Sequence, residues 1–299
     1  ASTNSYTTPS NSTTTTYYVE AFNGTCASFP RTEVVVTVSS TPTITGTTPG
    51  SRCGTGTVAL SAAASAGTVN WYSALTGGTS LGSGTTFTTP SISSTTTYYA
   101  QADNLGCLST PRTAVVATIN QGPALSVSAQ TNVSCNGGSN GSATILASGS
   151  TTPYTYSWSP SGGSAATATG LAAGGYTVTV TGANSCSTQQ VVTITQPSVL
   201  AVAAASQTNV ACFNGTSGAA SVATPTGGTS PYTYNWTPGN PTGDGTASVT
   251  GLTAGTWTCT VTDANGCTAA RSFTLTQPSA ALSISAASQT NVSCFGGSN

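Results

Sequence analysis

The side chains best suited to chemistry in this chain are its cysteines. Nine cysteines occur among the 299 residues, and histidine is absent. Zinc sites and dithiol redox sites favour Cys-x-x-Cys pairs or mixed Cys/His sets, and the sequence contains neither. A serine nucleophile likewise has no imidazole to activate it. We therefore predict disulfides formed in an oxidising compartment, and we predict no catalytic residue, metal site or cofactor.

Carboxylates add little to this chemistry. The five acids are Glu20, Glu33, Asp103, Asp244 and Asp263. Glycoside hydrolysis needs two cooperating carboxylates. Here they would have to be Asp244 and Asp263, and Asp244 lies in a Gly-Asp-Gly loop found in only one part of the chain. Calcium needs about six to eight oxygens, so Asp103 and Asp263 are interpreted as caps of their own turns. The chain is not expected to be an enzyme.

Charge is scarce throughout the sequence. Charged side chains make up 3% of the residues, whereas about a quarter is usual. Nucleic-acid binding requires a basic surface, which four scattered arginines cannot form. No apolar run approaches the ~20 residues of a membrane-spanning helix, so membrane insertion is not expected. The absence of an initiator methionine leads us to expect a mature or excised segment.

Hydrophobic residues occur in short runs that alternate with threonine. Examples are residues 34–38 (VVVTV), 176–180 (YTVTV) and 273–276 (FTLT). A period of two with β-branched residues is typical of half-buried strands. Proline and glycine interrupt nearly every stretch that is long enough for a helix. The pattern predicts an all-β chain whose strands have Thr-rich outer faces.

The sequence repeats with a period of about 80 residues, in two types. TYYVEAFNGTC (16–26) returns as TYYAQADNLGC (97–107), and TNVSC (131–135) returns as TNVAC (208–212) and TNVSC (290–294). This unit size and turn spacing favour tandem Ig-like β-sandwiches in an elongated array. The predicted domains are the C-terminal part of an Ig-like repeat (1–41), an Ig-like repeat (42–121), two units of the second type (122–198 and 199–279) and the start of a third (280–299).

Each complete unit places a tryptophan between two cysteines. The predicted disulfides join the cysteines within a unit: Cys53–Cys107 around Trp71, Cys135–Cys186 around Trp158, and Cys212–Cys267 around Trp236. Each bond would close a loop of about 50 residues, worth roughly 4 kcal/mol. The other cysteines, Cys26, Cys259 and Cys294, are predicted to be unpaired within this sequence. Cys259 aligns with Val178 and is interpreted as a small buried hydrophobe.

Tyrosines recur in pairs at corresponding places in the units. They are Tyr17 and Tyr18, Tyr98 and Tyr99, Tyr154 and Tyr156, and Tyr232 and Tyr234. An aromatic strip that binds sugars is one interpretation. Packing in the core or at its rim is preferred, because adjacent residues of a strand face opposite sides of the sheet.

The second repeat type resembles the SprB repeat of giant surface adhesins in gliding bacteria of the Bacteroidota. NVSCNGGSNGSATI, PYTYSW, TGLAAGGYTVTVTGANSC and VTITQP carry the resemblance, which covers residues 122–299. Residues 1–121 resemble the Ig-like domain found beside such repeats, through TTYY, the cysteine after a turn, and PRT followed by alternating valines. The resemblance implies export by the type IX system and display on the bacterial surface.

The function predicted from these features is that of a non-catalytic stalk segment in an extracellular adhesin or filament. Expected partners are neighbouring repeats of the same chain, with like chains or surface glycans as further candidates. One alternative is a module that binds carbohydrate or a partner protein, for which the loop carrying Asp244 is the candidate site. Another is a subunit of a homopolymeric surface fibre.

Overall fold

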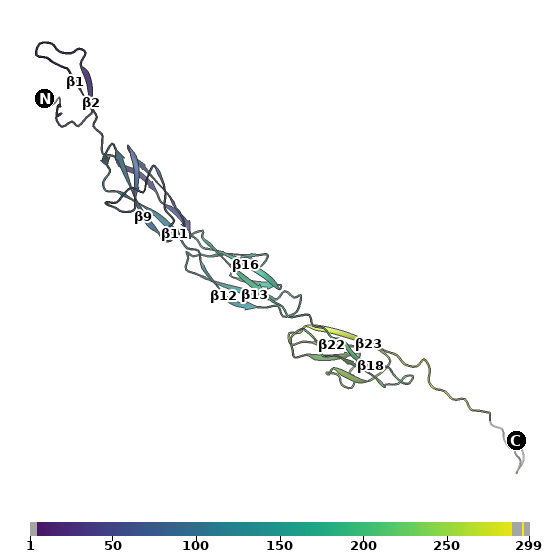
Figure 1. The fold of residues 1–299 in the computed structure, drawn as a ribbon. Helices are drawn as coiled ribbons and strands as arrows, with labels where there is room; N and C mark the ends of the chain where they lie inside the picture. The colour runs from purple at the N-terminus through teal and green to yellow at the C-terminus, as the bar shows by residue number, and fades with distance from the viewer. Residues whose placement is uncertain (1–4, 289–294, 296–299) are drawn as a thin grey trace. The chain divides into compact units, whose positions relative to one another are not determined.

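The structure is a computed structural model that describes residues 5–288 and residue 295. Every regular element among these residues is a β-strand, so the predicted all-β class is confirmed. None of the described residues forms a helix with the length and apolar character needed to cross a membrane. Near the N-terminus, β1 (Thr15–Val19) and β2 (Thr32–Val36) form an antiparallel hairpin (Figure 1).

Residues 42–121 form two sheets that enclose one core. One sheet has the order β4-β11-β9-β6-β7, with β10 paired to β9, and the other has the order β3-β5-β8. β4 runs parallel to β11, whereas β9 and β11 are antiparallel. The strands are β3 (Ile44–Thr48), β4 (Gly50–Cys53), β5 (Ala59–Ala64), β6 (Thr68–Tyr72), β7 (Gly82–Ser83), β8 (Thr86–Thr88), β9 (Thr96–Asn104), β10 (Cys107–Leu108) and β11 (Thr113–Asn120).

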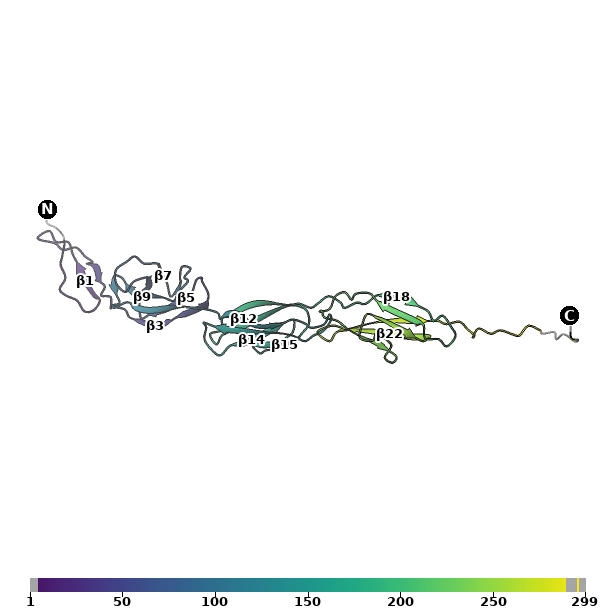
Figure 2. The same cartoon turned by 90° about the horizontal axis from the view of Figure 1, so that it is seen from below.

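Residues 122–198 and 199–279 share a second topology. Each has two three-stranded sheets, with the orders β12-β13-β15 and β14-β16-β17 in the former and β18-β19-β21 and β20-β22-β23 in the latter (Figure 2). The first set is β12 (Ala124–Thr131), β13 (Gly141–Ser148), β14 (Thr155–Ser159), β15 (Thr167–Leu171), β16 (Gly174–Thr181) and β17 (Ser187–Ile194). The second is β18 (Ala204–Thr208), β19 (Gly218–Val222), β20 (Thr233–Thr237), β21 (Ser248–Leu252), β22 (Gly255–Thr262) and β23 (Thr268–Leu275).

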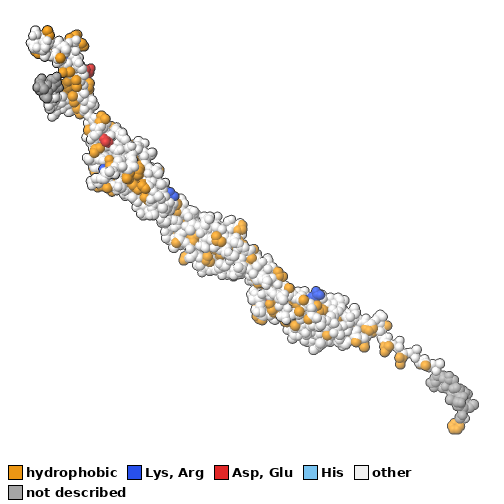
Figure 3. Space-filling model, in the orientation of Figure 1, with side chains coloured by type: hydrophobic (Ala, Val, Ile, Leu, Met, Phe, Trp, Pro, Cys, Tyr) orange, Lys and Arg blue, Asp and Glu red, His pale blue; other side chains and the backbone are white. Residues whose placement is uncertain are grey.

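Hydroxyl side chains occupy the outer faces of these sheets. On neighbouring strands they hydrogen-bond to each other: Thr144 with Thr167 at 3.0 Å, Ser206 with Ser221 at 2.6 Å, and Thr258 with Ser272 at 2.9 Å. Charged side chains are sparse on the face of the molecule shown in Figure 3. Threonine therefore supplies both the wettable surface and the β-branched shape that strands favour.

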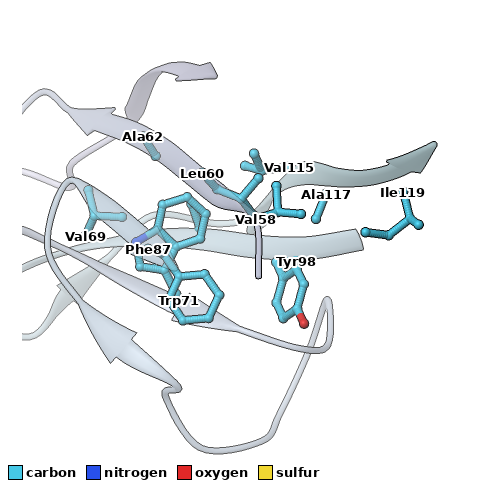
Figure 4. Packing of buried hydrophobic residues seen from close by; sticks show 11 residues of the cluster. Val58, Leu60, Ala62, Val69, Trp71, Phe87, Tyr98, Val115, Ala117 and Ile119 are labelled. Carbon is cyan, nitrogen blue, oxygen red and sulfur yellow. The ribbon is translucent and has the colours of Figure 1, made fainter. Parts of the chain in front are cut away.

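Aromatic rings occupy the centre of the core of residues 42–121. The rings of Trp71 and Phe87 stack with centroids 5.3 Å apart, and Tyr98 tilts against Phe87 at the same distance (Figure 4). Leu60 and Val115 come from the opposing sheets and close the core on either side. Residues 199–279 have a corresponding core that contains Trp236 and Phe273.

Candidate functional site: disulfides that join successive repeats

Two disulfides each connect one repeat to the next. Cys53 is bonded to Cys186 and Cys135 to Cys267, with Cα atoms 5.5 and 5.7 Å apart. The bonded cysteines are 133 and 132 residues apart in sequence. In the chain-entropy model a loop of this size, taken alone, stabilises the folded state by about 5 kcal/mol. The described residues divide into two compact units, and each disulfide lies inside one of them.

The predicted pairing within units is therefore wrong. Cys107 and Cys212 are free thiols, so the bonds Cys53–Cys107, Cys135–Cys186 and Cys212–Cys267 do not form. Of the cysteines predicted to be unpaired, Cys26 is a free exposed thiol and Cys259 a free buried one. Cys294 lies outside the described residues.

The length of the last strand of each unit explains the error. In residues 199–279, Cys267 directly precedes β23. Val210, two residues before Cys212, donates its backbone N–H to the carbonyl of Thr276, which lies just beyond the other end of that strand. Eight residues of strand span about 24 Å. A disulfide needs Cα atoms roughly 4.4–6.8 Å apart, so the two cysteines of a unit lie too far apart to bond.

The same separation holds in residues 42–121. Cys53 pairs in register with Asn120, at the C-terminal end of β11. Cys107 pairs with Asn104 at the far end of β9. We call Cys53, Cys135 and Cys212 the end-loop cysteines, and Cys107, Cys186 and Cys267 the turn cysteines. A bond joins the end-loop cysteine of one unit to the turn cysteine of the next.

Side chains of the following repeat also hold the connecting segment beside the first disulfide. The backbone carbonyl of Gln121 accepts a hydrogen bond from Ser150 Oγ at 2.9 Å and another from Asn184 Nδ2 at 3.1 Å. Asn184 Oδ1 in turn accepts from the backbone N–H of Cys186 at 3.1 Å. One asparagine thus shapes the turn that presents the cysteine and fixes the linker.

An equivalent asparagine lies at the second disulfide. Asn265 Nδ2 donates to the carbonyl of Ser134 at 3.1 Å, directly before Cys135. Asp263 shapes this turn, because its Oδ1 accepts from the N–H groups of Asn265 and Cys267 at 2.9 Å and its Oδ2 accepts from that of Thr229 at 2.8 Å. The turn cysteine is therefore held in place by hydrogen bonds that do not depend on the disulfide.

Asp263 is a buried carboxyl, 5% exposed. Burial acts to raise its pKa, but hydrogen bonds from backbone N–H groups, led by that of Cys267, outweigh burial and hold the pKa below its usual value. A carboxyl whose pKa is lowered by folding stabilises the protein above its unfolded pKa, near 3.9. That stability is lost as the pH falls through the folded-state pKa.

Asp263→Asn should therefore lower the melting temperature at pH 7 and flatten its dependence on pH below about 4. The asparagine side chain retains one acceptor oxygen, but the nitrogen that replaces Oδ2 cannot accept the hydrogen bond from the N–H of Thr229. Thermal unfolding at pH 7, 4 and 2.5 measures both effects, with the exposed Glu33→Gln as the control variant. An acid transition that is the same in Asp263→Asn and the unmodified chain would contradict this role.

The other two aspartates also bind backbone groups of their own loops. Asp103 Oδ1 accepts from the N–H of Gly106 at 2.8 Å. Asp244 Oδ1 accepts from the N–H groups of Trp236 and Gly245, at 2.8 and 2.9 Å. In the preceding repeat a backbone carbonyl, that of Gly163, receives the N–H of the corresponding tryptophan. The Asp244 carboxylate thus replaces a backbone acceptor in the lengthened loop.

The paired tyrosines pack against their own units. Tyr98 is buried, and Tyr154 and Tyr232 are half-buried with hydroxyls that donate to the carbonyls of Ser150 and Gly227, at 3.3 and 2.7 Å. Tyr18, which is 63% exposed, is the clear exception. These contacts favour the packing interpretation over a sugar-binding strip.

The four described free thiols differ sharply in environment. Cys26 and Cys212 are exposed, Cys107 is partly exposed and Cys259 is fully buried. Burial raises the pKa of Cys259 to about 11, with a smaller contribution from the carboxylate of Asp244. A thiol with that pKa is about one part in ten thousand thiolate at pH 7, and the thiolate is the nucleophile.

Maleimide labelling of the native chain should therefore modify Cys26 and Cys212 rapidly and leave Cys259 unmodified. In denaturant Cys259 should react as readily as the others, because unfolding removes both its burial and the nearby carboxylate of Asp244. Peptide mapping by mass spectrometry reads out each site. Rapid native labelling of Cys259 would contradict its place in the core.

Sequence models of two protein families match the chain. The Ig-like domain CHU_C associated matches residues 40–120, and the SprB repeat matches residues 127–163 and 204–241. These matches confirm the resemblance seen in the sequence and the Ig-like fold class. The search of curated proteins found no match.

Three solved structures that resemble the chain share little sequence identity with it. The N-terminal eight Ig domains of the Down Syndrome Cell Adhesion Molecule isoform 1.30.30 share 12% identity with a TM-score of 0.40, over 91% of this chain and 44% of that one. The full ectodomain of mouse nectin-like molecule 4 shares 14% identity with a TM-score of 0.34, over 78% of this chain and 98% of that one. The fibronectin(III)-like modules of Clostridium thermocellum CbhA share 17% identity with a TM-score of 0.29, over 52% and 93% respectively.

Proposed function

Because the chain contains an Ig-like domain and SprB repeats, we propose that it is a non-catalytic stalk segment of a bacterial surface adhesin. Both families are structural domains, and disulfides are typical of proteins outside the reducing cytosol. The observation that carries the proposal is the pairing of the disulfides, each of which joins one repeat to the next.

Such pairing suits a part that transmits force. A bond within a domain limits how far that domain unravels, whereas a bond to the next domain also holds the connection between them. At the first connection the Gln121 carbonyl is fixed by Ser150 and Asn184 in addition to the Cys53–Cys186 bond. Hinge motion at this linker would have to break both hydrogen bonds, and the disulfide limits how far it could go.

The outer faces of the sheets are wettable and carry few charges that could attract charged partners. They carry cross-strand Thr and Ser pairs in place of charged residues. We propose that the chain is exported by the type IX route and displayed on the cell surface in a gliding adhesin or filament. Its partners there would be the neighbouring repeats, with like chains or surface glycans as further candidates.

Antibodies raised against the folded chain test the location. They should label intact, unpermeabilised cells of the bacterium that encodes it, and external protease should remove the label. Labelling only after permeabilisation would refute surface display.

A carbohydrate array probed with the full chain tests the passive role. We expect no saturable binding, because the candidate carboxylate of Asp244 is already bound to two backbone N–H groups. Binding to one sugar class, abolished by Asp244→Asn, would instead make the chain a ligand-binding module.

A further inference from the structure

Two of the free cysteines occupy positions that are bonded elsewhere in the same chain. Cys212 is the end-loop cysteine of residues 199–279 and corresponds to Cys135, which is bonded to Cys267. Cys107 is the turn cysteine of residues 42–121 and corresponds to Cys186 and Cys267. The chain thus contains two disulfides between successive repeats, and two free thiols at positions that correspond to the bonded ones.

The loop around Cys212 has the same internal architecture as the bonded loop around Cys135. In each loop, five corresponding hydrogen bonds connect the cysteine loop to itself and to the residues after the last strand. For Cys135 they are Val133 N to Thr195 O, Thr195 N to Asn132 Oδ1, Gly138 N to Cys135 O, Gly137 N to Gln196 Oε1 and Ser134 N to Asn140 Oδ1. For Cys212 they are Val210 N to Thr276 O, Thr276 N to Asn209 Oδ1, Gly215 N to Cys212 O, Asn214 N to Gln277 Oε1 and Ala211 N to Ser217 Oγ.

The matching distances show that this loop is fully formed without its disulfide. The bond from Val133 to Thr195 and its counterpart from Val210 to Thr276 are both 2.9 Å long. The bonds that accept at Gln196 and Gln277 are 2.7 and 3.0 Å. Cys212 is exposed on this preformed loop, so a second thiol can reach it without rearrangement of the unit.

The two disulfides in the structure show what kind of cysteine an end-loop cysteine bonds to. Both partners of end-loop cysteines lie in a hairpin turn where an asparagine, Asn184 or Asn265, comes two residues before the cysteine and donates to a backbone carbonyl at the connection. Cys107 also lies in a hairpin turn, but there the asparagine, Asn104, comes three residues before the cysteine. Asn104 Nδ2 donates to Ser40 O at 3.2 Å, and the Cys107 sulfur lies 3.7 Å from Ser39 O in the same connecting segment. The Cys267 sulfur likewise lies near a backbone carbonyl, 3.5 Å from Ser134 O, which directly precedes its bonded partner Cys135.

We propose that Cys212 is the attachment site for the turn cysteine of the following repeat in the same polypeptide. The sequence supplies the start of that repeat, because TNVSC at 290–294 recurs 82 positions after TNVAC at 208–212. By the same rule Cys107 receives the end-loop cysteine of a preceding unit. The disulfides then form a continuous series in which every connection between complete repeats is cross-linked.

Formation of the bond follows ordinary thiol–disulfide exchange. The Cys212 thiolate attacks one sulfur of a small disulfide such as oxidised glutathione and releases one glutathione thiolate. The turn-cysteine thiolate then attacks the Cys212 sulfur and releases the second glutathione. Two cysteine thiols are oxidised to one disulfide, one glutathione disulfide is reduced to two thiols, and the protons remain with the solvent or the released thiols.

A lengthened chain tests the proposal. Residues 1–279 are followed directly by a second copy of residues 199–279, which reproduces the natural Ser198–Val199 connection at the new boundary. After oxidation with glutathione, unreduced peptide mapping should find Cys212 bonded to Cys267 of the appended copy. The bonds Cys53–Cys186 and Cys135–Cys267 should remain, and Cys212 of the appended copy should stay free.

The matched control replaces the appended Cys267 with serine, Cys267→Ser, and should add one maleimide-reactive thiol, at Cys212. Protection of Cys259 in both copies confirms that each has folded. A free Cys212 in the oxidised, folded lengthened chain would overturn the proposal, as would a bond to Cys267 of its own repeat. A ladder of chains joined through Cys212 and Cys107 of different molecules would also overturn it, because the partner would then be a second copy.

Discussion

Reduction of both disulfides should lengthen the fully stretched chain by about 57 nm. With the bonds intact, a path through the covalent structure crosses from Cys53 to Cys186, returns along the chain to Cys135 and crosses again to Cys267. That path leaves about 163 residues out of the load-bearing chain, each worth roughly 3.5 Å of extension. Pulling the full chain by its termini, with and without reductant, measures the difference as contour length.

Double substitutions distinguish this pairing from bonds within units. Cys53→Ser together with Cys186→Ser should add only about 11 nm, because the Cys135–Cys267 bond still shortens the path. The matched control, Cys107→Ser together with Cys212→Ser, should add nothing. If the bonds lay within units, that control would instead release about 38 nm, which is the result that would contradict the structure.

The strands and repeats could be predicted from the sequence because their signals are local. Alternation along residues 176–180 and 273–276 reports which side chains face the core. β16 covers the first run, and β23 covers the second as far as Leu275. Alignment of Cys259 with Val178 likewise indicated an inward position, and both side chains are fully buried.

The disulfide pairing could not be predicted in the same way because it depends on which end of the sandwich each cysteine reaches. A signal was nevertheless present. An eight-residue strand follows Cys267 directly, so that cysteine and the end loop that meets the strand's other end cannot be neighbours. The role of Asp244 had no sequence signal, because the repeat without it uses the carbonyl of Gly163 for the same purpose.

Trp236→Ala should have the largest effect of any single substitution in residues 199–279. The side chain is fully buried, its ring lies 5.5 Å from that of Phe273, and its Nε1 donates to the Thr246 carbonyl at 2.9 Å. Truncation leaves a cavity and an unpaired carbonyl, and buried tryptophans typically cost about 3–5 kcal/mol when replaced by alanine. For a unit of about 80 residues that is a large share of the free energy of unfolding.

The labelling rate of the Cys259 thiol measures this loss of stability. It pairs in register with Trp236 across β20 and β22 and is fully buried. If its thiol reacts only when the repeat unfolds, a loss of 3–5 kcal/mol should accelerate its labelling by about two to three and a half orders of magnitude. Trp257→Ala is the matched control. Trp257 is half-buried and packs at the edge of the same core, so its replacement should have a much smaller effect.

A second measurement separates unfolding from local access through the cavity. Urea denaturation of the full chain should show the transition of this repeat at lower denaturant in Trp236→Ala, with Cys259 labelling accelerated by the matching factor. Fast labelling with an unchanged urea transition would mean that the cavity alone admits the reagent. An unchanged transition together with unchanged labelling would show that Trp236 does not anchor the core. A shift in both would show that the stability of the repeat depends on Trp236, which lies between Cys212 and Cys267 in the sequence.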